Sequence, residues 1–222
     1  MTIDLIRGFV KYSELIAAIV GTIFFYKYKN TPLKYFLYLL WYITLTEFLG
    51  WYIRETGNLT YIDEDGIHYM HWLYNTLEFI TFNTLFFIYS KYLESINYKK
   101  RVRYFAYIFS IVFTINWIFI QNYFKEGAEM PVILGSIFLI LSILFYLIEL
   151  LRSEKIIVFH RLLLFWISVG LLLFYTGTIP FTLKVNEYML FPGIHKLFLI
   201  IYILAITMYL TFTFGFIWSR KE

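Results

Sequence analysis

The chain has 222 residues, of which 60% are hydrophobic and only 15% are charged, and its formal net charge is +4. A soluble domain carries roughly 25% charged residues, so this composition excludes an ordinary water-soluble protein. The absence of cysteine excludes disulfides, thiolate catalysis and cysteine-ligated metals. Apolar runs long enough to cross a bilayer recur along the whole length, which predicts an all-α membrane protein.

Seven such runs predict a single transmembrane domain over residues 1–222, a seven-helix bundle with no room for a soluble domain. The expected spans are residues 9–26, 35–53, 70–90, 104–123, 132–151, 162–182 and 194–218. Most are close to the ~20 residues that cross ~30 Å of hydrocarbon. Proline, glycine and charged residues separate them, and Pro180 and Pro192 are expected to bracket the loop before the last span.

The lysines and arginines predict the orientation. Thirteen of the 19 fall at one set of span ends and six at the other. Cytoplasmic loops carry the excess of positive charge, so the N-terminus is expected outside and the C-terminus in the cytoplasm. The expected location is a bacterial inner membrane, with the lipid bilayer as the main surrounding partner.

The third span carries polar residues on one face. His71, Asn75 and Glu78 stand at i, i+4 and i+7, which places them on the same side of a helix. An ionisable group at membrane depth is costly, and it indicates a functional site by default. The orientation places this face in the outer half of the bilayer.

Other spans carry polar groups at a similar depth, which predicts a shared outer-half layer centred on Glu78. The candidate ligand- or proton-binding residues are Glu78, Glu47, Asn75, His71, Glu14, Asn116 and His195. A purely structural role stays open, because hydrogen bonds between transmembrane helices are common. That alternative applies most directly to the asparagines, and Glu14 can also pair with Lys11 at i−3.

The same layer contains nitrogen and oxygen ligands suited to a divalent metal such as zinc. The candidates are His71, Glu78 and His195, with His68 and Glu47 nearby, but no compact motif such as HExxH joins them. Nucleophile motifs and phosphate-binding glycine loops are also missing from the sequence. The composition implies no particular cofactor, and nothing in it supports nucleic-acid binding.

Three functions fit this pattern. The first is a sensory or receptor-like component that binds a small ligand or proton and signals through a cytoplasmic or membrane partner. The second is a small-solute or ion transporter with a parallel three-plus-one-plus-three helix plan, similar to that of SWEET transporters. The repeated tripeptides at residues 66–68 and 193–195 favour that plan, although the proline-glutamine pairs of that group are missing. The third is a metal-dependent intramembrane enzyme.

Overall fold

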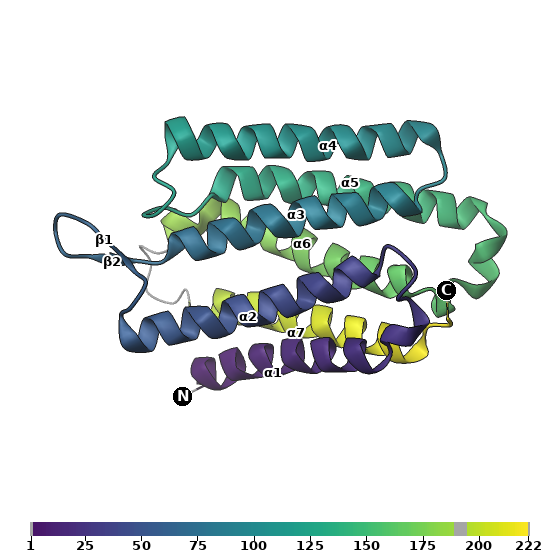
Figure 1. Cartoon of the computed structure of the whole chain (residues 1–222), viewed down its shortest axis with the longest axis horizontal. Helices are drawn as coiled ribbons and strands as arrows, with labels where there is room; N and C mark the ends of the chain where they lie inside the picture. The colour runs from purple at the N-terminus through teal and green to yellow at the C-terminus, as the bar shows by residue number, and fades with distance from the viewer. Residues whose placement is uncertain (1, 189–194, 222) are drawn as a thin grey trace.

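Figure 1 shows the computed structural model, in which long helices lie side by side and alternate in direction. It describes the backbone of residues 2–188 and 195–221, and the side chains of residues 6, 8–183 and 199–221. The described residues form seven long α-helices: α1 (Thr2–Ile23), α2 (Lys34–Thr56), α3 (His71–Tyr92), α4 (Ile96–Ile115), α5 (Glu129–Arg152), α6 (Leu163–Tyr188) and α7 (His195–Trp218). The fold is therefore all-α, as predicted.

Short elements connect the long helices. The 3₁₀ turns η1 (Phe25–Lys27) and η3 (Glu154–Arg161) follow α1 and α5, and the π-helical turn η2 (Asn116–Ile120) continues α4. A small hairpin of β1 (Tyr61–Ile62) and β2 (His68–Tyr69) joins α2 to α3. We call the end of the bundle with this hairpin the hairpin end, and the other end, where the chain finishes, the C-terminal end (Figure 1).

Five helices among the described residues are long and apolar enough to cross a membrane. They are Lys34–Thr56, Ile96–Ile120, Glu129–Arg152, Leu163–Leu183 and Leu199–Trp218. Large apolar side chains also point outward, such as Phe119 (78% exposed) and Phe48 (65% exposed). A soluble monomer rarely exposes so much apolar surface. These features indicate an integral membrane protein.

The predicted spans 9–26 and 70–90 form α1 and α3, but neither helix is among those five. Polar content is the physical reason for α3, whereas the part of α1 whose side chains are continuously described, residues 8–23, is shorter than the 18 residues that a span needs. α1 carries Lys11 and Glu14, and α3 carries Asn75, Glu78 and Asn83. These residues lower the hydropathy of the two helices that contribute most of the candidate site.

Most predicted span ends lie within three residues of the observed helix ends, but four do not. α1 begins at Thr2, α4 begins at Ile96 and ends at Ile115, where η2 continues it, and α6 ends at Tyr188. Backbone hydrogen bonding continues a helix past its apolar part, so α4 runs through the basic residues 99–103. The prediction that Pro180 begins a loop was wrong, because Pro180 lies inside α6. Pro192 lies outside the described residues.

The helix contacts define a ring. Going round it, neighbours pack in the order α1, α2, α3, α5, α6, α7 and back to α1, while α4 lies outside against α3 and α5. Aromatic side chains fill the ring toward the C-terminal end. There Phe36 of α2 contacts Phe212 of α7 edge-on at 5.0 Å, and Tyr28 stacks on Phe216 at 5.5 Å. Apolar aromatic contacts therefore join α2 and α7 in the half of the ring where α2 begins and α7 finishes.

The hairpin is attached to the loop between α4 and α5. Asp63 accepts hydrogen bonds from the backbone N–H groups of Asp65 and Ile67, and its second oxygen lies 3.4 Å from the Lys125 ammonium. Tyr61 stacks on Phe124 with ring centres 5.1 Å apart. Gly66 closes the acidic turn with a φ of +75°, a conformation that glycine adopts without strain.

Acid should release this hairpin. The Ile67 N–H first, and then Lys125, lower the pKa of Asp63 from its ordinary value of about 3.9. A lowered folded-state pKa stabilises the attached form above the ordinary value, and this contribution is lost as the pH falls through the folded pKa. A spin label introduced by Glu64→Cys should therefore become more mobile only below about pH 4. In the Asp63→Asn variant the label should be mobile at every pH. Identical pH titrations of the label in the Asp63→Asn variant and in the protein that keeps Asp63 would contradict the attachment of the hairpin through Asp63.

Candidate functional site

A cavity of about 540 Å³ lies between α1 and α2, and we call it the α1–α2 cavity. Its lining combines charged, polar and aromatic side chains: Lys11, Tyr12, Glu14, Leu15, Trp41, Thr44, Leu45, Glu47, Phe48 and Trp51. Both helices present these residues at helical spacing, so the cavity follows from the packing of two regular elements. Two of the predicted carboxyl residues, Glu14 and Glu47, are thereby brought to one site.

Glu14 is the most deeply buried charged residue of this site, with only 3% of its surface exposed. The Tyr209 hydroxyl of α7 donates a hydrogen bond to its Oε2 at 3.2 Å. Its Oε1 is buried and accepts no hydrogen bond from the described residues. Buried polar atoms are normally paired, so an open acceptor beside a cavity indicates a position where a ligand atom can bind.

The polar group extends from Glu14 across the ring. Tyr209 lies within electrostatic range of Glu47 and of Tyr175 on α6, and Tyr175 lies within range of Glu78 on α3. Glu47 and Glu78 are half-buried. Five helices (α1, α2, α3, α6 and α7) thus contribute to one polar layer, which we call the carboxyl–tyrosine layer.

Sequence reasoning did not include Tyr175 or Tyr209 in the site. The chain has 21 tyrosines, and the default interpretation places tyrosine near the membrane surface. One signal was available for Tyr209. It lies nine residues before the end of α7, about 14 Å along the helix, which is too deep for an interfacial residue.

No protein-family model, curated protein or solved structure matches the chain. The chemistry of the site is therefore inferred from its own residues. A buried carboxyl with one open oxygen, a neighbouring ammonium and a tyrosine hydroxyl can bind a hydrogen-bond donor or hold a proton. Binding needs no further group, whereas hydrolysis would need a positioned nucleophile and base as well.

The structure gives Asn75 a structural role. Its Nδ2 donates to the carbonyls of Tyr123 and Glu126 at 2.8 and 2.9 Å, and its Oδ1 accepts from the Ala128 N–H at 3.0 Å. Asn75 therefore holds the α4–α5 loop against α3. Ligand binding by Asn75 stays a prediction, but its amide is already hydrogen-bonded to that loop.

Asn116 also forms a local contact. It is 6% exposed in the π-helical turn, and its Nδ2 donates to Gln121 Oε1 at 2.7 Å. The Gln121 N–H in turn donates to the Asn116 carbonyl at 2.8 Å, which ends the helix. Asn116 is thus occupied at the end of α4, a helix that lies outside the ring.

The two histidines stand at helix starts. His71 begins α3 and is exposed beside the α4–α5 loop, whereas the side chain of His195, which begins α7, lies outside the described residues. In the part of the chain that the structure describes, no group of three or more metal-ligating residues forms. His71 and Glu78 therefore have no further described ligand with which to complete a metal site.

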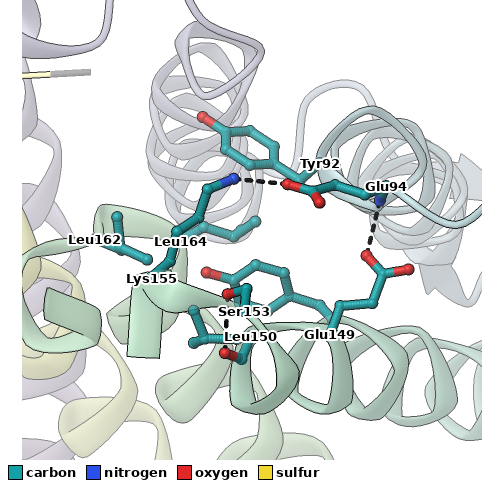
Figure 2. Close-up of a pocket in the computed structure, with 9 residues that line it drawn as sticks. Tyr92, Glu94, Glu149, Leu150, Ser153, Lys155, Leu162 and Leu164 are labelled. Carbon is teal, nitrogen blue, oxygen red and sulfur yellow. Dashed lines mark hydrogen bonds and ion pairs between the residues drawn. The ribbon is translucent and has the colours of Figure 1, made fainter. Parts of the chain in front are cut away.

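A smaller cavity of about 230 Å³ lies at the C-terminal end, and Figure 2 shows its lining. Glu149 of α5 accepts hydrogen bonds from the Glu94 and Ser95 N–H groups at 2.7 and 2.9 Å, immediately before α4 begins. Lys155 pairs with the Glu94 carboxylate at 2.7 Å. The Glu149 carboxylate thus holds the backbone immediately before α4 against α5.

Proposed function

We propose that the protein is a receptor-like component of a bacterial inner membrane, in which all seven helices cross the bilayer. α1 and α3 have 22 residues each, about 33 Å of helix, and they pack beside the apolar helices. The bias of lysine and arginine supports a C-terminal end in the cytoplasm, so the hairpin and the N-terminus face outward. The bilayer then surrounds the exposed apolar faces.

The observation that carries the receptor function is the hydrogen bond between Glu14 and Tyr209. It joins the wall of the α1–α2 cavity to α7, the helix that leads to the C-terminal end. A ligand or proton that binds the open Oε1 of Glu14 withdraws negative charge from the carboxyl and so weakens the hydrogen bond that the tyrosine hydroxyl donates to Oε2. Binding is thereby coupled to the packing of α7 against α1, which is a two-state element that a ligand can bias.

Contacts at the C-terminal end support the transmission of this change. The Lys27 ammonium donates to the carbonyls of Phe216, Ile217 and Ser219 at 3.1, 2.8 and 2.8 Å. The Arg220 N–H donates to the Arg161 carbonyl at 2.9 Å. Because α7 is bound to the η1 and η3 turns, a displacement of α7 alters the cytoplasmic surface offered to a signalling partner.

A transporter is the second candidate, favoured by the helix order. The triplets α1–α2–α3 and α5–α6–α7 occupy successive halves of the ring, with α4 outside, which fits a three-plus-one-plus-three plan. The contact of α3 with α5 then corresponds to that of α7 with α1. Against transport, aromatic side chains fill the ring toward the C-terminal end, where a pathway would need polar groups.

Breaking the Glu14–Tyr209 hydrogen bond should shift the C-terminal end of α7. Because the chain lacks cysteine, spin labels can be introduced specifically by Lys100→Cys and Arg220→Cys, both at exposed positions. A hydrogen bond worth about 1 kcal/mol changes a two-state population roughly fivefold. Tyr209→Phe in nanodiscs should therefore change the distribution of label–label distances measured by pulsed electron resonance.

The matched control is Tyr107→Phe, at an exposed tyrosine on α4, which should leave the distances unchanged. Distances that are the same in Tyr209→Phe and the unsubstituted protein would contradict the receptor mechanism. Proteoliposomes loaded with a pH-sensitive dye test the transporter function. Proton flux that Glu14→Gln or Glu78→Gln abolishes would favour transport.

A further inference from the structure

We propose that the α1–α2 cavity binds an amphipathic amine that enters sideways from the bilayer. Its protonated nitrogen carries at least one N–H group and binds Glu14, and its apolar tail lies in the mouth of the cavity. This inference rests on the proposed receptor function and names the chemical class of its ligand.

The mouth of the cavity is apolar and faces outward from the bundle. Tyr12, Leu45 and Phe48, all in its lining, are 66%, 62% and 65% exposed. On a membrane-spanning helix pair such side chains contact lipid tails, so the entrance opens to the hydrocarbon. Its volume of about 540 Å³ lies within the roughly 300–1,000 Å³ of small-molecule sites. A molecule that reaches this entrance must itself partition into lipid.

The inner wall of the cavity requires a hydrogen-bond donor. Glu14 Oε1 is buried without a partner among the described residues, whereas Oε2 is bonded to Tyr209. The Thr44 hydroxyl lies close enough to act on the Glu14 carboxyl, but it has a single proton, which it donates to the Leu40 carbonyl at 2.9 Å. A ligand N–H group would supply the missing donor, and a hydrogen bond to a charged group is among the stronger ones in proteins.

The charges and rings of the lining favour a cation. Two carboxyl side chains and one ammonium, those of Glu14, Glu47 and Lys11, line the cavity. Trp41, Phe48 and Trp51 add aromatic faces, which attract cations. An anionic headgroup or a fatty acid would meet two carboxyls of like charge. The favoured occupant is therefore an alkyl or aryl ammonium ion.

Three probes with the same twelve-carbon tail separate these requirements. Dodecylamine is protonated at pH 7 and has N–H donors, dodecyltrimethylammonium is a cation without N–H, and dodecanol is neutral. Binding is the calorimetric heat for protein-loaded phosphatidylcholine nanodiscs minus that for empty ones, which removes simple partitioning. Dodecylamine should bind at least tenfold more tightly than dodecyltrimethylammonium, and dodecanol should show no protein-dependent heat.

Two substitutions test the position of the site. Glu14→Gln should weaken dodecylamine binding at least tenfold. Leu45→Trp narrows the exposed mouth of the cavity and leaves the carboxyl in place, so it should also weaken dodecylamine binding at least tenfold. Because Leu45 is exposed, this variant should fold, and it tests the site if Glu14→Gln does not fold. Glu149→Gln, in the other cavity, should leave binding unchanged. Equal binding of the three probes, or unchanged binding in Leu45→Trp, would overturn the proposal.

The binding measurements and the label distances test the ligand class and the receptor mechanism separately. If the label distances respond to Tyr209→Phe but dodecylamine does not bind, only the proposal of an amine ligand is contradicted, and the receptor mechanism stands. Dodecylamine binding that leaves those distances unchanged in every variant would support the site and contradict the receptor mechanism.

Discussion

Replacing Asn75 by leucine is expected to release the loop between α4 and α5 and to destabilise the hairpin end. Leucine has nearly the same size, but it cannot replace the three hydrogen bonds to Tyr123, Glu126 and Ala128. Each buried group left unpaired costs about 1–3 kcal/mol, and water can reach part of this loop. We therefore expect a loss of about 3 kcal/mol in the free energy of unfolding.

Asn83 on the same helix provides a matched control. Its Nδ2 donates to the Phe79 carbonyl within α3, and its Oδ1 accepts one interhelical hydrogen bond, from Ser110 of α4 at 3.0 Å. Asn83→Leu should cost only about 0.6 kcal/mol, the usual value of such a bond in membranes. Thermal unfolding in detergent and hydrogen exchange over residues 121–128 give the two readouts.

The two outcomes also separate a structural asparagine from a ligand-binding one. Faster exchange in the loop together with a lower melting temperature would support the structural role of Asn75. Unchanged exchange and stability in Asn75→Leu would contradict it, and would leave ligand binding as the role predicted for Asn75.

The helices were predictable because long apolar runs have a simple physical cause. In hydrocarbon, backbone N–H and C=O groups must be paired within the segment, and a helix pairs them. Most of the helix ends that were predicted wrongly lie where the apolar run stops but the helical hydrogen bonds of the backbone continue. The basic residues before Tyr104 end the apolar run but not α4, and Pro180 removes one N–H from α6 without ending it.

The polar layer was only partly predictable, because helical spacing gives a direction but no partner. His71, Asn75 and Glu78 share a broad face of α3, yet Asn75 contacts the α4–α5 loop while Glu78 lies within electrostatic range of Tyr175 of α6. The partner of each side chain depends on which helix or loop packs beside that part of the face. Tyr209 illustrates the same limit, since only the contact of α1 with α7 brings it to Glu14.

A side chain at Gly170 should separate α6 from α7. A Cβ atom there would lie 2.8 Å from the Phe212 ring and 3.1 Å from the Met208 carbonyl oxygen, and it would also overlap the Thr211 hydroxyl. Small residues let membrane helices approach this closely. A ring can rotate, but the carbonyl belongs to the α7 backbone, so the helix itself must shift. Gly170→Val should cost about 3 kcal/mol, with Gly170→Ala intermediate.

Gly8→Val is the control, because a Cβ at Gly8 would have no heavy atom within 4 Å. Its melting temperature in detergent should change little, whereas that of Gly170→Val should fall by several degrees. Equal melting temperatures for the two variants would show that α6 and α7 tolerate a larger separation than their contacts imply.

The same substitution tests whether the packing of α7 sets the state of the carboxyl–tyrosine layer. Met208 and Thr211, which the added side chain would displace, flank Tyr209, the residue bonded to Glu14. Gly170→Ala is the mild form that should still fold, and it should change the distances between labels at positions 100 and 220 in the same direction as Tyr209→Phe. If Gly170→Ala changes these distances in the direction opposite to Tyr209→Phe, then α7 moves without breaking the hydrogen bond between Tyr209 and Glu14. Because Gly170 does not line the α1–α2 cavity, agreement between the two variants would identify α7 itself as the element that links the cavity to the C-terminal end.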